Sequence, residues 1–221
     1  MRILGPMQID VISDTVCPWC YIGKRRLERA IRLRPQIEFK VRWRPFQLDP
    51  TTPPEGVDRK TYIERKFGHT DKVKPIHAAL LKAGESEGID FAFEKIARTP
   101  NTINSHRLIR WAQAMGFQDA LVERLFKGYF TEGADIGQAE VLKRFGADAG
   151  MDPELVGDLL ESEIDLDKVH HEDSMARKIG INGVPSAVGP SRSGMTSVTG
   201  FFSRTATTAS ASSRMPTSTR P

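Results

Sequence analysis

The stretch that decides the fold runs from Met7 to Ala30 and reads M-Q-I-D-V-I-S-D-T-V-C-P-W-C-Y-I-G-K-R-R-L-E-R-A. Apolar Ile9, Val11 and Ile12 are typical of a short strand, and the polar residues 13–15 are typical of a turn. A Cys-x-x-Cys motif comes next, and the apolar residues after it have helical spacing. The stretch therefore predicts a strand, a turn, a Cys-x-x-Cys and a helix, in that order.

This order predicts that Cys17 is a reactive thiol. Pro18 fits the first position of a helix, because the N–H group that proline lacks would be unpaired there. Cys17 is then the N-cap residue, where free backbone N–H groups and the helix dipole stabilise a thiolate. Cys20 lies one turn further on the same face, within reach for a disulfide. We predict Cys17 as the attacking thiol and Cys20 as the resolving thiol.

A metal site and a pair of inert buried thiols are the alternatives for this motif. The chain has 2 cysteines and 5 histidines, whereas a structural zinc site needs about four ligands at characteristic spacings. The histidines are scattered, and none has a zinc-finger spacing to the cysteines. We therefore interpret the pair as a redox dithiol, with no metal and no cofactor beyond the redox-active disulfide itself.

Length and composition are ordinary for a soluble globular protein. The chain has 221 residues, of which 39% are hydrophobic and 27% are charged, enough for one large domain or a domain carrying an insertion. No apolar run approaches the ~20 residues that span a bilayer, and the N-terminal apolar stretch is too short for a signal peptide. We expect a cytoplasmic protein without a membrane partner, in which a Cys-x-x-Cys is catalytic rather than structural.

The net charge of +4 comes entirely from the C-terminal segment. Four arginines and no acidic residue follow Pro185, and the rest of the chain has 28 basic and 28 acidic residues. Because the body of the protein is neutral, the charge gives no reason to expect a nucleic-acid partner.

Beyond the motif, the pattern predicts a second strand and then a helical block. Gln36–Phe46 alternates apolar and charged residues, which is typical of a strand with one buried face, so the chain begins with a βαβ unit and a parallel pair. Residues 48–57, with 3 prolines and a glycine, are interpreted as a linker. From Asp58 to about Ser162 we predict helices and no strand. The helices are expected at Thr61–Phe67, Val73–Gly84, Asn101–Met115, Gln118–Phe130, Gln138–Ala149 and Pro153–Glu161.

A further helix is predicted at Asp165–Ile179, and the residues after it are G-I-N-G-V-P. A Val-Pro pair after a glycine-containing turn, opposite a Cys-x-x-Cys, invites a cis-proline interpretation for Val184–Pro185. Only about 5–6% of X-Pro bonds in folded proteins are cis, so position alone favours the trans form.

Four segments together resemble the DsbA-like thioredoxin-fold oxidoreductases, and they look closest to the FrnE-like branch. The segments are S-D-T-V-C-P-W-C-Y-I-G-K, Y-I-E-R-K-F-G, P-N-T-I-N-S-H-R-L and G-I-N-G-V-P, and the likeness covers about Met7–Pro185. The resemblance implies an α/β, thioredoxin-like fold with an inserted all-helical domain, and protein thiol–disulfide oxidoreductase activity. It also implies that the loop at Val184 and Pro185 packs against the disulfide, with the proline cis.

On this basis we expect four parts in the chain. Residues 1–52 and 163–202 form the two parts of the thioredoxin-like domain, residues 53–162 form the inserted helical domain, and residues 203–221 form a disordered tail.

The C-terminal part is expected to be aberrant, because the match fails after Pro185. The family pattern has two hydrophobic strands, a Ser-Gly turn and an amphipathic helix there. This chain has almost no large apolar residue after Phe202, and such a composition cannot bury enough surface to offset chain entropy. A translation frameshift soon after codon 185 would produce this change, and a natural disordered tail is the alternative.

Residues next to the thiols are candidates for supporting roles. Pro18 and Trp19, between the cysteines, are expected to set the redox poise, and Trp19 either shapes substrate contact or only covers the helix start. Asp14 either tunes the Cys20 proton as a buried carboxylate or forms the turn.

Two more sets of residues have both a functional interpretation and an ordinary structural one. His106 lies in the segment that, in the family, faces the active-site cleft, and a histidine without a role on a helix surface is the alternative. Lys24, Arg25 and Arg26 are interpreted as the solvated face of a helix, with a minor contribution to thiolate stabilisation as the alternative.

Three functions fit these observations. The first is a thiol–disulfide oxidoreductase that uses Cys17 and Cys20 on protein or small dithiol and disulfide substrates. The second is a glutathione-dependent isomerase or transferase, resembling 2-hydroxychromene-2-carboxylate isomerase and kappa-class glutathione transferases, which use a serine-type residue at the first thiol position. The third is a chaperone or interaction module. Two cysteines favour the first function, with glutathione kept as a candidate co-substrate, and the oligomeric state is not predicted.

Overall fold

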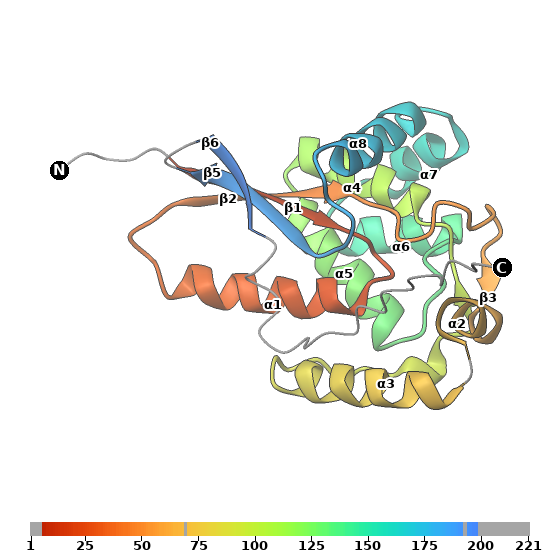
Figure 1. The fold of residues 1–221 in the computed structure, drawn as a ribbon. Helices are drawn as coiled ribbons and strands as arrows, with labels where there is room; N and C mark the ends of the chain where they lie inside the picture. The colour runs from red at the N-terminus through yellow and green to blue at the C-terminus, as the bar shows by residue number, and fades with distance from the viewer. Residues whose placement is uncertain (1–5, 69, 192–193, 199–221) are drawn as a thin grey trace, which may run out of the picture.

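The computed structural model describes residues 6–68, 70–191 and 194–198 (Figure 1). Over these residues the main sheet has the strand order β2-β1-β5-β6. Its strands are β1 (Met7–Ser13), β2 (Phe39–Pro45), β5 (Ser186–Ser191) and β6 (Gly194–Val198). β1 and β2 are parallel, which requires a crossover, and α1 (Pro18–Arg32) supplies it. The predicted βαβ unit is therefore confirmed.

Helices cover both faces of this sheet. Phe39 and Val41 of β2 share a groove with residues of α1, whereas Arg44 of β2 forms an ion pair with Glu172 of α8 (Leu166–Lys178). Successive residues of a strand point to opposite faces. α1 and α8 therefore lie on opposite sides of the sheet, as Figure 1 shows.

The predicted helical block is present, with ends that differ from the prediction by a few residues. Its helices are α2 (Arg59–Phe67), α3 (Thr70–Glu85), α4 (Ile103–Met115), α5 (Gln118–Phe130), α6 (Ala139–Asp148) and α7 (Pro153–Glu161), with a 3₁₀ turn at Phe93–Lys95. α7 begins as expected, because Asp152 caps it by accepting from the N–H groups of Glu154 and Leu155.

The prediction that this block contains no strand is wrong. β3 (Val57–Asp58) and β4 (Arg98–Thr99) form an antiparallel pair. Two residues are too few to show a period of two in the sequence. Gly56 allows the approach, because it has a φ of +75 and a Cβ there would lie 2.9 Å from the Thr99 carbonyl oxygen.

Sheet and helices share one hydrophobic core. A single cluster of buried residues includes Val11 of β1, Tyr21 of α1 and Trp43 of β2, together with Leu108 and Phe126 from the helical block. Tyr21 stacks on Phe126 with 5.2 Å between ring centroids. The helical block therefore holds α1 and the sheet in place, and the bounds 53–162 for an inserted domain stay a proposal.

The sequence pattern did not predict β5, the strand that directly follows Pro185. Val11 of β1 lies opposite Ala187 of β5, and β5 continues into an antiparallel pair with β6. Backbone pairing does not require large side chains, and Ser186 and Val188 fill buried positions on β5. The end of the second part at residue 202 and the tail at 203–221 lie beyond Val198, outside the described residues. The frameshift soon after codon 185 stays a prediction.

None of the helices in the described part of the chain combines the length and the hydropathy of a membrane-spanning segment.

Candidate functional site

The Cys-x-x-Cys motif lies where β1 passes into α1. Cys17 is the N-cap residue of α1, with an extended backbone (φ −96, ψ 111), and Pro18 is the first helical residue. The turn is closed by two backbone hydrogen bonds, from Cys17 N–H to the Asp14 oxygen at 3.1 Å and from Cys20 N–H to the Cys17 oxygen at 3.0 Å. The predicted position of Cys17 at the N-cap is therefore confirmed.

The segment before β5 lies against Cys17. The Val184–Pro185 peptide bond is cis, as the family resemblance implied. The Sγ atom of Cys17 lies 3.6 Å from the Val184 carbonyl oxygen, to which it donates. Val184 and Pro185 are both half-buried. The structure thus brings together residues separated by 167 positions in the sequence.

The two thiols have different environments. Cys20 is 0% exposed and Cys17 is 4% exposed. Burial raises the pKa of the Cys20 thiol well above its usual value, and the hydrogen bond and charge of Cys17 raise it further, against smaller opposing effects from Ser13 and the Asp14 backbone. Cys20 is therefore held as a neutral thiol while Cys17 occupies the helix N-terminus.

Asp14 lies three residues before Cys17 and makes contacts through both its backbone and its side chain. Its carbonyl closes the turn, and its side chain is buried at 1% exposure. The Oδ2 atom accepts a hydrogen bond of 2.7 Å from Leu48 N–H, whereas Oδ1 has no hydrogen-bond partner among the residues described. Both interpretations of Asp14, a turn former and a buried carboxylate, fit its position.

His106 comes from α4 to the same place. It is buried, so the alternative of a surface histidine is wrong. Its Nε2 atom lies 3.2 Å from the Phe46 carbonyl oxygen and 3.5 Å from Oδ1 of Asp14. Because a carbonyl oxygen only accepts hydrogen bonds, we assign the proton to Nε2. The N–H is then used by the Phe46 carbonyl, and the ring lies near Oδ1 of Asp14 without a hydrogen bond to it.

Ser105 is a contact residue that the sequence analysis missed. Its hydroxyl lies 2.8 Å from the Thr15 hydroxyl, and both side chains are buried. The sequence contained part of the information needed to find this contact. Thr15 lies two residues before Cys17, and Ser105 directly precedes the candidate residue His106. Ser13, whose side chain faces Cys20, was missed as well. The N-terminal turn of α4 is thus joined by polar contacts to the loop that carries the thiols.

Trp19 and Lys24 occupy different surroundings. Trp19 is half-buried and packs against the core at the start of α1, which fits its simpler role as a cover of the helix start.

The interpretation of Lys24 as solvated is wrong, because its side chain is 2% exposed and forms ion pairs with Glu28, Asp119 and Glu123. These carboxylates offset the cost of burying the ammonium group.

The sequence matches the model of the DSBA-like thioredoxin domain family over residues 8–200. The chain belongs to this family. The match extends past Pro185, so the expected end of the likeness there is corrected, and the α/β thioredoxin-like fold is confirmed. The finer assignment to the FrnE-like branch stays a prediction.

Several known proteins resemble the chain over most of its length. A probable DsbA oxidoreductase from Streptomyces coelicolor is 28% identical, with a TM-score of 0.75 over 83% of this chain and 80% of that one. The uncharacterized protein YwbO of Bacillus subtilis is 25% identical over 146 residues, 66% of this chain and 68% of that protein. A 2-hydroxychromene-2-carboxylate isomerase shares the fold alone, with 16% identity and a TM-score of 0.63 over 82% of this chain and 84% of that one.

Proposed function

We propose that this protein is a thiol–disulfide oxidoreductase that acts on disulfides or dithiols of proteins or small molecules. The main support for the proposal is that two neighbouring cysteines have different surroundings. Cys17 lies at the N-terminus of α1, 3.6 Å from the Val184 carbonyl, and the fully buried Cys20 lies behind it. A helix N-terminus favours a thiolate, and a neutral neighbouring thiol provides the second step.

The reaction has two balanced steps. The Cys17 thiolate attacks one sulfur of a substrate disulfide, so that a mixed disulfide forms and the other substrate sulfur leaves as a thiolate. Cys20 then loses its proton and attacks the Cys17 sulfur, which releases the second substrate thiolate and leaves the Cys17–Cys20 disulfide. The substrate gains two electrons and the protein loses two. The reverse sequence oxidises a substrate dithiol.

In this proposal Asp14 is the base that receives the Cys20 proton, and His106 is a positioning residue. Asp14 has one oxygen held by Leu48 N–H and one oxygen without a hydrogen bond among the residues described. The Nε2 atom of His106 lies 3.5 Å from that second oxygen and limits its movement from the side of α4. Trp19 and Pro18 shape the entrance beside Cys17.

The reactivity of the two thiols is expected to differ in the reduced protein. Limiting iodoacetamide at neutral pH should label Cys17 first, because alkylation requires a thiolate and burial raises the pKa of Cys20. Peptide mapping by mass spectrometry after partial reaction measures the order. Preferential labelling of Cys20 would contradict the assignment of the nucleophile, and the single variant Cys20→Ser serves as the control for Cys17 labelling.

Asp14→Asn is expected to slow the second step about 100-fold and to leave the first step nearly unchanged, since general base catalysis contributes about this much. Asparagine keeps the shape of the side chain and the oxygen that accepts from Leu48. In single-turnover experiments the mixed disulfide with a fluorescent disulfide peptide should accumulate, and its decay should become faster as the pH rises, because the Cys20 thiol, whose pKa is raised, must then lose its proton to hydroxide. An equal slowing of both steps would assign Asp14 a structural role only.

The proposal is tested by the reduction potential of the Cys17–Cys20 pair together with insulin reduction and oxidation of a dithiol peptide. A pair that equilibrates with glutathione and turns over either substrate supports it. Glutathione conjugation or isomerisation without dithiol turnover would favour the isomerase instead. Glutathione is retained here as a candidate co-substrate, and the cytoplasm as the proposed location.

A further inference from the structure

The segment that follows β2, from Phe46 to Leu48, is held by hydrogen bonds along its whole length. Phe46 N–H donates to the Ser13 oxygen at 3.0 Å, and the Phe46 carbonyl lies 3.2 Å from Nε2 of His106. Leu48 N–H donates to Oδ2 of Asp14 at 2.7 Å. This segment therefore contacts both polar side chains to which the proposed function assigns supporting roles.

The middle residue of this segment, Gln47, is held by α8. Its N–H donates to Oδ1 of Asp173 at 2.8 Å, and its carbonyl accepts from Nη2 of Arg177. Arg177 also donates to both oxygens of Asp173, at 2.9 and 3.1 Å, and its guanidinium lies 4.2 Å from the centre of the Phe46 ring. Asp173 and Arg177, the α8 pair, therefore hold both backbone groups of one residue.

The Gln47 carbonyl and the Leu48 N–H belong to the same peptide group. The group is planar and trans, so the two bonds point in opposite directions. Arg177 donates to one side of this group, and Asp14 accepts from the other side. A donor on the carbonyl also strengthens the N–H as a donor, because hydrogen bonds in a chain polarise one another. The guanidinium therefore influences the direction and the strength of the hydrogen bond to Asp14.

The orientation of the Asp14 carboxylate depends on this hydrogen bond. Its second oxygen, Oδ1, has no hydrogen-bond partner among the residues described. Nε2 of His106 lies 3.5 Å from that oxygen, but its N–H is used by the Phe46 carbonyl. A shift of the Leu48 N–H would therefore move the oxygen that is free to accept a proton.

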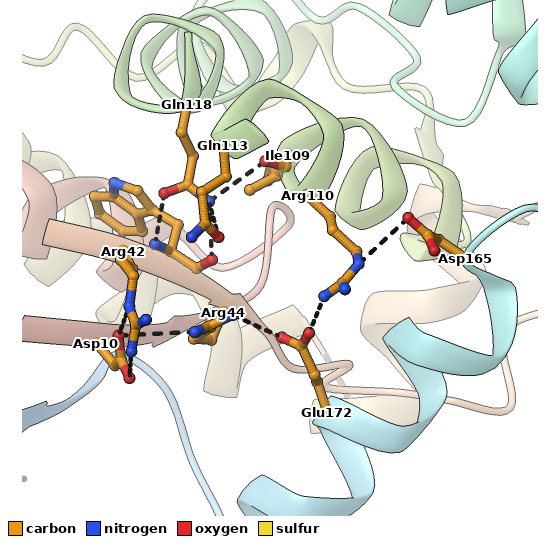
Figure 2. A network of polar contacts seen from close by, with 10 residues as sticks. Asp10, Arg42, Arg44, Ile109, Arg110, Gln113, Gln118, Asp165 and Glu172 are labelled. Atoms are coloured by element: carbon orange, nitrogen blue, oxygen red, sulfur yellow. Dashed lines mark hydrogen bonds and ion pairs between the residues drawn. The ribbon is translucent and has the colours of Figure 1, made fainter. Parts of the chain in front are cut away.

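The helix that carries the α8 pair is firmly attached to the rest of the fold. Glu172, which directly precedes Asp173, forms ion pairs with Arg44 of β2 and Arg110 of α4, as Figure 2 shows. Val169 of the same helix is 1% exposed. The α8 pair is therefore held at a defined distance from the sheet and from α4.

We propose that Arg177 is a positioning residue for the Asp14 carboxylate and acts through the peptide group between Gln47 and Leu48. Asp173 holds the guanidinium in place from one turn earlier on α8. The inference rests on the proposed function, in which Asp14 receives the Cys20 proton. Arg177 therefore affects the second step of the reaction and not the attack by Cys17.

Single-turnover experiments with a fluorescent disulfide peptide measure both steps in Arg177→Met. Decay of the mixed disulfide should slow about tenfold, a part of the effect of losing a general base, while its formation stays nearly unchanged. Arg124→Met is the matched control and should leave both steps unchanged. Arg124 also pairs with carboxylates, those of Glu132 and Asp148, and lies 3.8 Å from the centre of the Phe145 ring.

The double variant with Asp14→Asn shows whether Arg177 acts through Asp14. In this background Arg177→Met should slow the decay by less than about twofold, since the carboxylate that it orients is gone, and a further slowing of about tenfold would overturn the inference. An Asp14→Asn variant that resolves as fast as the wild type would overturn the role of Asp14 in the proposed function and this inference with it. Slowing by Asp14→Asn but not by Arg177→Met would overturn this inference alone.

A measurement without turnover tests the geometry. In the amide proton–nitrogen correlation spectrum of the reduced protein, Arg177→Met should move the Leu48 proton signal upfield and speed its exchange with solvent, because its hydrogen bond weakens. Arg124→Met should leave this signal in place. An unmoved Leu48 signal in Arg177→Met would overturn the inference.

A second variant keeps the test decisive if Arg177→Met does not fold. Arg177 is 40% exposed, so Arg177→Gln keeps a polar end at a site that water reaches. Its shorter side chain does not span the distance to the Gln47 carbonyl, and the same slowing and the same upfield shift are expected. Wild-type values for both in a folded Arg177→Gln would overturn the inference.

Discussion

Cys17→Ser is expected to lower thiol–disulfide turnover by at least about 1000-fold. The serine hydroxyl is not ionised at neutral pH, so the helix N-terminus has no thiolate to stabilise. Cys20 cannot take over the first attack, because it is fully buried and its pKa is raised. Insulin reduction and dithiol-peptide oxidation measure the loss, and an unchanged thermal melt shows that the fold is intact.

The matched variant Cys20→Ser separates the two steps of the same reaction. It keeps the attacking thiol and should form a mixed disulfide that no longer resolves, which mass spectrometry detects as a stable adduct on Cys17. Full turnover by Cys17→Ser would contradict the proposed mechanism. Suppression of aggregation that survives replacement of both cysteines would favour the chaperone alternative.

Arg107→Met is expected to lower the free energy of unfolding by about 3 kcal/mol. Arg107 is 1% exposed, and it donates to the carbonyl oxygens of Leu159 and Leu160 in the last turn of α7 and of Ser162 and Ile164 after it. Removing the guanidinium takes this donor from the carbonyl groups of Leu160, Ser162 and Ile164, whereas that of Leu159 still accepts from the Ser162 hydroxyl. Each acceptor left unpaired costs about 1 kcal/mol or more where water cannot replace it. The melting temperature should fall by roughly 6–12 °C.

Arg110→Met on the same helix is the control for this substitution. Its side chain is 31% exposed and pairs with Asp165 and Glu172 in the network of Figure 2. Partly exposed ion pairs contribute about 1 kcal/mol or less. Equal destabilisation by both variants would show that the loss at Arg107 comes from the substituted methionine rather than from the unpaired carbonyl groups.

The local part of the site could be predicted from the sequence, because its signals are local. Pro18 at the first helical position fixes Cys17 as the N-cap, and the spacing of three places Cys20 on the same face. The family resemblance added the cis bond before Pro185. The catalytic roles of Cys17 and Cys20 stay proposals.

The sequence did not predict which polar side chains are buried. Lys24 has the spacing of a solvated helix residue, yet Asp119 and Glu123 of α5 enclose it from a part of the chain about a hundred residues away. The same holds for His106, whose contact with Asp14 depends on how α4 packs. β5 was missed for another reason, since its small residues show no alternation and the strand is held by backbone pairing.

Cys17 and Val184 are in contact although they lie 167 positions apart in the sequence. The contact can therefore form only late in the synthesis of the chain. Chain elongation at 5–20 residues per second makes the ribosome take about 10–30 s to produce the residues between them. Through that interval the nascent chain carries both cysteines outside the ribosome without the loop that later lies against the first. The contact of Cys17 with Val184 forms only after that segment is made, whereas the burial that distinguishes Cys20 from Cys17 comes from α1 and the core around it.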